Sequence, residues 1–418
     1  MADFPPAGFV PSKSAVPGIT VYKPAPKIIK LDEIVEFRCP HCGGETAFSI
    51  ADGGLSCAYC GYHEAPPGKI VGREAETFEF TVETVEMSVN GWGGERKELH
   101  CYTCGAHISI APESLSTSCP YCASNKVIHH EAPQDAIRPR FLVPFEVDED
   151  SCTHITREWL GSSWMVPKEL RQVAIQDFTP MFLPYWTFGS TSEASWRAEV
   201  GHTRSYRDSK GRRRTRTVWK WESGRVLRKF QDILVRGSDR VSGRLYKKIG
   251  AYDLNVLTAY EPGFLAGIHA QAYEVTLEIA WEKARFAMRE ATRKQCRKQA
   301  SSSKIRNFSM QLDFQDENWR YILLPMYINT YHYDNQPFQL IINGQNGKIA
   351  GQRPADWRKI GLVGALLTLP GILTFLILLI LFRDTLGGGG GILSFLLFTA
   401  GLGAAIAIAI QAQKLDDV

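Results

Sequence analysis

Four Cys-x-x-Cys pairs near the N-terminus constrain this chain more than any other feature, because they repeat as a unit. Two pairs form a first set, and a second set follows at a displacement of 62 residues. Within each set, 14 residues separate the two pairs. A duplicated module explains this constant displacement better than chance does. The first set is Cys39, Cys42, Cys57 and Cys60, and the second is Cys101, Cys104, Cys119 and Cys122.

Each set contains the residues that a structural zinc ion requires. Zinc binds four ligands in tetrahedral geometry, and one Cys-x-x-Cys turn, or knuckle, supplies two thiolates. Gly43 and Gly105 follow directly after a knuckle, where a small residue lets backbone amides turn back toward the sulfurs. Four cysteines close the coordination sphere, so we predict two structural Zn²⁺ ions and no catalytic metal. An iron–sulfur cluster, a dithiol redox site and disulfides are the rival interpretations.

The cysteine modules define the first part of the domain organisation. We predict zinc ribbons over residues 31–66 and 99–130, joined by a connector over residues 67–98. Residues 1–30 are rich in Pro, Ala and Lys and have no apolar core, which indicates a flexible tail and no secretory signal peptide. Eight of the ten cysteines are spaced as metal ligands, which favours a reducing compartment.

Two long apolar runs lie at the C-terminal end. Residues 360–382 and 391–410 are each long enough to cross a bilayer as a helix, which predicts a transmembrane hairpin. Basic residues flank its outer ends, so the positive-inside tendency predicts that both termini are cytoplasmic. Small residues on the second run, Gly401 and Gly403 among them, would let the helices approach closely. The alternative is a pair of buried helices in a soluble core.

Residues 136–352 are predicted to form a mixed α+β body rich in antiparallel strands. One helix is expected over Ser151–Arg171, with Trp159 and Trp164 in the core. A second, clearer helix is expected over Ala272–Lys298. Its predicted core positions are Leu277, Ala280, Trp281, Ala284 and Met288.

Aromatic, alternating segments predict strands over Phe182–Val200 and Leu323–Ile342. The two regions begin alike, because Phe-Leu-Pro-Tyr-Trp from residue 182 resembles Leu-Leu-Pro-Met-Tyr from residue 323. Two related β units packed together would explain the similarity, and chance is the competing explanation. The segment Phe78–Val89 also alternates and fits either a strand or an amphipathic connector.

Charge is unevenly distributed, although 48 Lys and Arg nearly balance 44 Asp and Glu overall. Residues 1–150 contain 12 basic and 21 acidic residues, whereas residues 194–250 contain 17 basic and 5 acidic. A basic middle region predicts an anionic partner. The turn Ser209-Lys210-Gly211 and the arginines after it predict a hairpin with a basic tip, which would contact phospholipid head groups, contact nucleic acid or remain solvated. We favour lipid over nucleic acid for these arginines, which are Arg212, Arg213, Arg214 and Arg216.

Sequence motifs of common enzymes are missing. The chain has no phosphate-binding Gly-x-x-x-x-Gly-Lys-[Ser/Thr] loop, no His-Glu-x-x-His motif, no Gly-x-Ser-x-Gly elbow and no dinucleotide-binding fingerprint. The two cysteines outside the repeats, Cys152 and Cys296, carry no mark of a nucleophile. We therefore predict a protein that is not an enzyme.

The chain resembles a family of bacterial double zinc-ribbon proteins, often labelled as transcription-factor-IIB-type zinc-ribbon proteins or as primosomal helicase-like proteins. The resemblance spans residues 39 to about 360. A helicase activity is not expected, because the chain has no nucleotide-binding loop. The segments that carry the resemblance, besides the cysteines, are 91–97 (Gly-Trp-Gly-Gly-Glu-Arg-Lys), 141–145 (Phe-Leu-Val-Pro-Phe), 183–188 (Leu-Pro-Tyr-Trp-Thr-Phe), Leu324-Pro325 and 341–347 (Ile-Ile-Asn-Gly-Gln-Asn-Gly).

Some membrane-anchored double-ribbon proteins look like partners of phage-shock protein A, an ESCRT-III-like membrane-remodelling protein, or of flotillin-like scaffolds. The resemblance implies an adaptor at the bacterial inner membrane, and the charges that flank the hairpin predict that the bulk of the protein is cytoplasmic. Our leading hypothesis is a non-enzymatic adaptor that docks a cytoplasmic protein. The alternative is a membrane-tethered nucleic-acid-binding protein, against which the acidic first 150 residues weigh.

Overall fold

The computed structural model of the chain has a central 12-stranded sheet, two smaller sheets and a pair of long helices at its C-terminal end. It describes most of the predicted body, both cysteine modules and both apolar C-terminal helices. The described residues are 9–12, 21–24, 37–64, 69–75, 77–79, 97–110, 119–122, 124, 126–131, 137, 139–172, 178–240, 243–334, 336–381 and 389–416.

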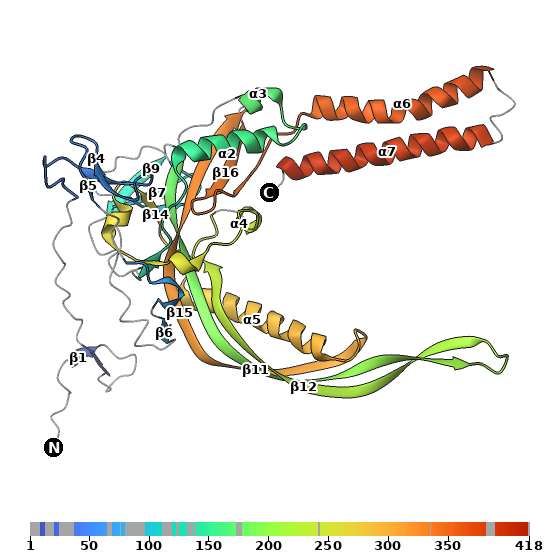
Figure 1. Cartoon of the computed structure of the whole chain (residues 1–418), viewed down its shortest axis with the longest axis horizontal. Helices are drawn as coiled ribbons and strands as arrows, with labels where there is room; N and C mark the ends of the chain where they lie inside the picture. The colour runs from blue at the N-terminus through green and yellow to red at the C-terminus, as the bar shows by residue number, and fades with distance from the viewer. Residues whose placement is uncertain are drawn as a thin grey trace.

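Three long strands form the spine of the molecule: β11 (Thr179–Arg207), β12 (Arg213–Arg236) and β15 (Ile305–Tyr333). β11 lies between the other two and pairs antiparallel with both. The first part of β11 is buried on both faces, as its continuous apolar run requires. Beyond Ser190 burial alternates along the strand, because only one face is covered there. Figure 1 shows the spine leaving the body as a long curved ribbon.

Shorter strands extend the sheet on both sides of the spine. β10 (Phe141–Leu142) runs parallel to β15, and β14 (His269–Gln271) runs parallel to β11. β14 also pairs with β8, so the second cysteine module continues the sheet of the body. The remaining strands of this sheet are β6 (Phe78–Glu79), β7 (Lys97–Cys101), β8 (His107–Ile110), β9 (Val127–Glu131), β13 (Thr258–Ala259), β16 (Gln336–Asn343) and β17 (Ile349–Gly351).

Two smaller sheets lie outside this one. The first cysteine module forms β3 (Thr46–Ser49), β4 (Gly54–Cys57) and β5 (His63–Glu64). In the predicted tail, β1 (Phe9–Ser12) pairs antiparallel with β2 (Val21–Pro24), and the rest of residues 1–30 lies outside the described residues. β6 covers the first two residues of the segment 78–89, and most of that segment is likewise outside the described residues.

The two similar segments noted in the sequence pair directly with each other. In the antiparallel ladder between β11 and β15, Phe182 lies opposite Pro325 and Leu183 lies opposite Leu324. The segments therefore form one central pair at the most buried part of the sheet. Each segment contains one proline, Pro184 or Pro325. Proline is tolerated in a strand only where the ladder does not need the N–H group that proline lacks.

The helix predicted over Ser151–Arg171 is wrong as a single element. The structure has α2 (Glu149–Gly161) and α3 (Lys168–Gln172), and the chain between them is not helical. Asp148 caps the start of α2 by accepting a hydrogen bond from the Ser151 amide at 2.8 Å. The glycine at the end of α2 and Pro167 interrupt the helical pattern. Trp164, predicted to be in the core, lies in this interruption and is 44% exposed.

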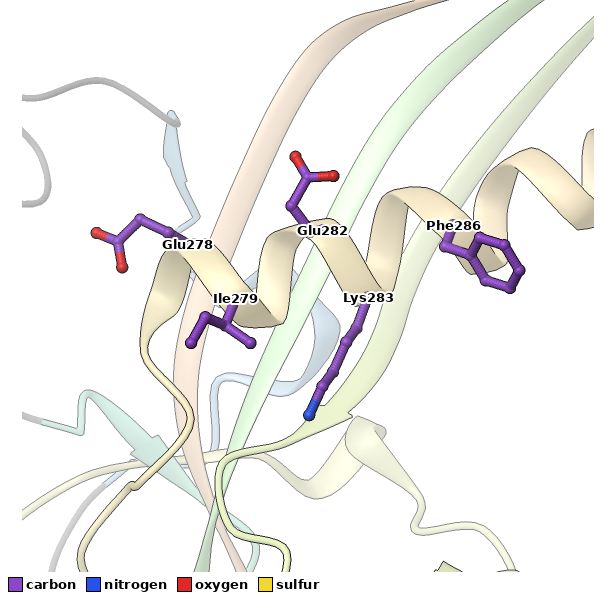
Figure 2. A pocket seen from close by; sticks show the side chains of 5 residues that line it. All are labelled: Glu278, Ile279, Glu282, Lys283 and Phe286. Carbon is purple, nitrogen blue, oxygen red and sulfur yellow. The ribbon is translucent and has the colours of Figure 1, made fainter.

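The helix predicted over Ala272–Lys298 is α5 (Leu277–Gln299), and all five of its predicted core positions are buried. Its outer face carries exposed apolar side chains in its first half, where Phe286 is 68% exposed. Figure 2 shows this face, which is lined by Glu278, Ile279, Glu282, Lys283 and Phe286. The other helical segments that the structure describes in the body are α4 (Gly243–Lys248), η2 (Leu254–Val256) and η3 (Pro262–Leu265), and the connector contains η1 (Gly72–Glu74).

The strand pairing of the spine is irregular around Gly189. The ladder between β11 and β12 shifts register between Phe188 and Ser190, and the ladder between β11 and β15 shifts at the next residue. Asp232 and Asp316, on the two outer strands, adopt positive φ angles of 55° and 54° there. Such bulges bend and twist a strand. We call the part of the molecule beyond this bend, residues 190–230 with residues 284–315, the arm.

The apolar C-terminal runs form α6 (Trp357–Leu381) and α7 (Gly389–Asp416), which pack against each other as a hairpin (Figure 1). Both are long and apolar enough to cross a membrane, and their side chains are mostly exposed. The core helices of a soluble protein are buried, whereas these long apolar helices are exposed. This exposure associates the chain with a membrane. The base of the hairpin contacts the body, where the Asp356 amide donates to the backbone oxygen of Met165 at 2.7 Å.

We expect Gly401→Leu to break the close packing of α6 and α7. A Cβ atom at Gly401 would clash with the backbone oxygen of Leu367, and backbone cannot move aside as a side chain can. Overpacking of this kind costs about 1–3 kcal/mol, so the unfolding temperature of the detergent-solubilised protein should fall. Gly403→Leu is the matched control, because nothing lies within 4 Å of a Cβ atom at Gly403. Equal unfolding temperatures for the two variants would contradict the packing.

Candidate metal centres

The first cysteine module (residues 37–64) brings its four cysteines together from two knuckles. One knuckle precedes β3, and the other begins at the end of β4. In each knuckle, the glycine that follows the second cysteine has a positive φ angle, 72° at Gly43 and 70° at Gly61. These glycine amides donate to the backbone oxygens of Cys39 and Cys57 at 2.9 and 3.0 Å, which closes each turn. The left-handed conformation explains why glycine is used there.

The second module (residues 97–131) repeats this construction. Gly105 has a φ angle of 68°, and its amide donates to the backbone oxygen of Cys101 at 2.7 Å. The amides of Cys101 and Cys119 each donate to a residue five positions further along the chain, as do those of Cys39 and Cys57. The repeat read from the sequence is therefore a repeat in backbone geometry as well.

In each module, the positions of the four sulfurs fit one tetrahedrally coordinated ion. In each module the four Sγ atoms lie within 4.8 Å of one another. Neighbouring Sγ atoms are 3.5 Å apart in the first module, and 3.6 and 3.7 Å apart in the second. A zinc–sulfur bond of about 2.3 Å in tetrahedral geometry places sulfurs roughly 3.8 Å apart. A disulfide requires about 2.05 Å, and all eight cysteines are free thiols in the structure.

The surrounding backbone favours ionised sulfur, which is the form that binds metal. Hydrogen bonds led by the Cys60 amide lower the pKa of the Cys57 thiol to about 7. In the second module burial alone would raise the pKa of Cys101, but the amides of Cys104 and Thr103 outweigh it and lower that pKa to about 7. Burial, and after it the neighbouring thiols of Cys122 and Cys101, raise the pKa of Cys104. A cation among the sulfurs stabilises their ionised form against burial and mutual repulsion, so both sites suit a divalent metal.

Three histidines near the knuckles are not among the ligands. Among the residues that the structure describes, the two groups that lie close enough to hold a metal ion contain cysteines alone. His41 is exposed on the first module. His100 stacks on His107 with ring centroids 4.3 Å apart, and His107 contacts the carboxylate of Glu98. These side chains hold the strands of the second module together beside the metal site.

The two modules differ in how they meet the body. The second knuckle of each module has a tyrosine before its last cysteine, Tyr59 in the first and Tyr121 in the second. Tyr121 is 7% exposed, and its hydroxyl donates to the sulfur of Met181 at 3.3 Å. The backbone oxygen of Tyr121 also accepts from the Thr330 hydroxyl at 3.1 Å. Tyr59, at the equivalent position, is 79% exposed.

The first module docks through a different surface. Phe48 on β3 is buried against Phe264, with ring centroids 5.3 Å apart, and its amide donates to the backbone oxygen of Ala266 at 2.9 Å. This contact leaves both knuckles facing outward. The exposed residues there include His41, Cys42, Ala58, Tyr59 and Cys60. The sequence contains both tyrosines but not this difference, which depends on which face of each module meets the body.

The basic tip predicted at the hairpin is present. β11 and β12 form one hairpin, in which Arg207 lies opposite Arg213 and Tyr206 lies opposite Arg214. Asp208 organises the turn by accepting from the amides of Lys210 and Arg212 at 3.0 and 2.9 Å. The Arg212 amide and the side chains near it lower the pKa of the Asp208 carboxyl.

All four predicted arginines at the tip are exposed. Arg212 and Arg214 form ion pairs with Asp208 at 3.3 and 3.1 Å, and Arg216 lies over the ring of Tyr206. These arginines are far along the chain from either metal site and belong to the arm instead.

Comparison with known proteins gives one informative relative. The chain is similar to the uncharacterized protein YdjG of Bacillus subtilis (strain 168), with 24% identity over 336 residues that cover 78% of this chain and 92% of YdjG. No family model matches the chain, and no solved structure matches it. The aligned 336 residues are many more than the two cysteine modules contain, so the similarity includes much of the body. The chain thus resembles a bacterial protein over most of its length and combines two four-cysteine metal sites with two helices of membrane-spanning length.

Proposed function

We propose that this protein is a non-enzymatic zinc-ribbon adaptor, anchored in the bacterial inner membrane by α6 and α7 with both termini in the cytoplasm. In this proposal zinc is the ion in both modules, and the first module docks a cytoplasmic protein. Four thiolates leave no open position on the ion, which supports a structural role for the metal. The membrane helices would keep the docked protein at the bilayer.

The difference between Tyr59 and Tyr121 carries this proposal. The repeat places one aromatic side chain at the same position of both modules, and in the second module that side chain seats the module on the body. In the first module the same group points into solvent beside exposed knuckle residues. Exposed tyrosines are enriched at protein interfaces, where they supply much of the binding energy.

The residues that surround Tyr121 on the body indicate the chemistry of the expected partner. Tyr121 packs in an apolar cluster that includes Met181 and Ile108, and polar groups hold its backbone at the rim. A partner for Tyr59 would offer a similar apolar groove with hydroxyl or amide donors at its edge. The family resemblance suggests a membrane-remodelling protein of the phage-shock type or a flotillin-like scaffold.

We expect Tyr59→Ser to release the partner. Loss of a central aromatic contact costs about 2 kcal/mol or more, so recovery in an affinity pull-down from native membranes in mild detergent should fall about thirtyfold. Phe286→Ser is the matched control, because Phe286 is another exposed aromatic residue, on α5. Zinc content should be unchanged in both variants. Loss of the partner in the Phe286 variant, with full recovery in the Tyr59 variant, would move the docking surface to α5.

A further inference from the structure

A cavity of about 500 Å³ lies on the body between α4 and the spine. Tyr185 of β11 and Arg236 of β12 line one side of it. The other side is formed by α4 and the segment that follows it, and Figure 1 shows α4 beside the spine. Cavities that bind small molecules have volumes of about 300–1,000 Å³ and combine apolar walls with a few polar groups. This cavity therefore has the size of a small-molecule site.

Aromatic rings form much of the cavity wall. Tyr185 and Tyr252 are buried, and the rings of Tyr185 and Tyr246 meet edge to face with 6.0 Å between their centroids. The Tyr252 hydroxyl donates to the backbone oxygen of Pro325 at 3.0 Å, which fixes this ring to the spine. Burial raises the pKa of the Tyr185 and Tyr246 hydroxyls, so both stay protonated and can donate to an anion.

The Asn-Gly-Gln-Asn-Gly turn at residues 343–347 holds the segment after α4 in place. The side-chain amide of Asn343 donates to the backbone oxygen of the lining residue Ile249 at 3.3 Å. Gln345 accepts from the Asp253 amide at 2.7 Å and donates to the Asp253 backbone oxygen at 3.1 Å. The wall is thus fixed before a ligand binds, which lowers the entropy cost of binding.

Cations gather around this cavity, although the chain outside the arm is acidic. The arm contains 20 Lys and Arg against 6 Asp and Glu, a net charge of +14, whereas the whole chain has +4, so the remainder has −10. Arg244 and Lys247 of α4 line the cavity and are exposed. Lys348 lies at its edge, because a Cβ atom at the lining residue Gly250 would be 3.0 Å from the Lys348 amine.

The charge around the cavity is not balanced by the protein itself. Arg236, the fourth cation, pairs with the Asp239 carboxylate at 3.0 Å, and its guanidinium lies 5.0 Å from the ring centroid of Tyr246. Arg244, Lys247 and Lys348 form no ion pair with a residue that the structure describes. Four cations and one carboxylate leave an excess of positive charge, which a phosphate ester with a charge of about −1.5 to −2 at pH 7 would largely neutralise.

We propose that this cavity binds a small organic phosphate. The phosphate group contacts the cations at the mouth, since Arg and Lys are the side chains that bind phosphate oxygens. The apolar part of the ligand packs against the tyrosine rings. A free phosphate ester and the head group of a phospholipid share this chemistry. The proposal is independent of the docking role of the first module.

Isothermal titration calorimetry of the full-length protein in an uncharged detergent tests this binding, with 1-naphthyl phosphate as the probe. Heats of titration into protein-free micelles are subtracted. Inorganic phosphate lacks the apolar part and 1-naphthol lacks the phosphate, so both should bind at least about tenfold more weakly than the probe. Equal affinities for 1-naphthyl phosphate and 1-naphthol would overturn the proposal.

Two double variants that each remove two positive charges locate the site. Arg244→Gln with Lys247→Gln should weaken binding of the probe at least about tenfold, because two charge-assisted contacts are lost. Lys294→Gln with Lys298→Gln, at exposed positions of α5, should leave the affinity unchanged. All four residues are exposed, so neither variant should unfold the protein. Equal affinities of the two double variants would overturn the site.

Ala251→Trp distinguishes a cavity from a charged surface. Ala251 lines the cavity and is exposed, so the larger side chain would fill the space while every cation remains. Binding of the probe should be lost, and undiminished binding would overturn the cavity as the site.

Competition against the probe identifies the source of the phosphate. Displacement by dihexanoyl phosphatidic acid alone would assign the site to a lipid head group, and displacement by adenosine monophosphate alone would assign it to a free phosphate ester. Either result supports a site for an organic phosphate. Displacement by neither compound would overturn the proposal.

Discussion

Replacing Cys104 and Cys119 together by serine is expected to unfold the second module and to destabilise the body with it. Zinc binding to small structural sites is worth about 10–16 kcal/mol, far more than a module of this size gains from its core. Loss of this zinc site should also destabilise the body, because β8 of the module pairs with β14 in the main sheet. Leu99 and Ile108 are fully buried in the cluster that contains Met181. Unfolding the module would expose this side of the body to water.

The same change in the first module is the matched control. Cys42→Ser with Cys57→Ser should also remove one metal ion, but the first module meets the body mainly through Phe48. We expect elemental mass spectrometry to show one zinc ion per chain in each double variant and two in the unmodified protein. Thermal unfolding in detergent should show a large loss for the second-module variant alone. Equal unfolding temperatures would contradict the proposed coupling.

Asp232→Ala is expected to have the next largest effect, a loss of about 3–5 kcal/mol in the free energy of unfolding. Arg320 is only 5% exposed and pairs with the Asp232 carboxylate at the bend of the spine. Arg320 also donates to the Thr187 hydroxyl at 3.2 Å and to the backbone oxygen of Ala75 at 3.3 Å. Without Asp232, a buried positive charge has only neutral partners. Burial lowers the pKa of Arg320, because a buried site disfavours the charged form of its guanidinium group.

Denaturant unfolding of the detergent-solubilised protein measures this effect. The control is Asp239→Ala, whose carboxylate pairs with Arg236 and Lys283 at 3.0 and 3.3 Å but is largely solvent-exposed. Exposed pairs of this kind contribute about 0–1 kcal/mol. Adding Arg320→Met to the Asp232 variant should restore much of the stability, because the charge then disappears with its partner. Equal losses in the Asp232 and Asp239 variants would show that the buried pair has no special role.

Local chemistry explains what the sequence predicted well. The cysteine sets were identified because knuckle spacing and a constant displacement are local properties of the chain. The two C-terminal helices follow from apolar runs, and the core face of α5 follows from the spacing of its apolar residues. The hairpin tip at Ser209-Lys210-Gly211 follows from its turn residues.

Features that depend on distant contacts were not predicted. The break between α2 and α3 was missed because the apolar pattern continues through Trp164, whereas the glycine and proline around it end the helix. The sequence predicts strands in the spine but not a ladder that runs without interruption from the body into the arm. It contains Tyr59 and Tyr121 at equivalent positions, but their opposite exposure depends on how each module packs.

In the proposed function, the knuckle surface of the first module binds a protein while the second module is packed against the body. Site-specific photo-crosslinking in living cells tests this difference, with a photoreactive phenylalanine analogue in place of Tyr59 or, as a control, of Phe286. We predict a crosslink to another protein from position 59, none from position 286, and loss of the first when Cys42 and Cys57 are changed to serine. A crosslink to nucleic acid from position 59, or to a protein from position 286 alone, would contradict the claim.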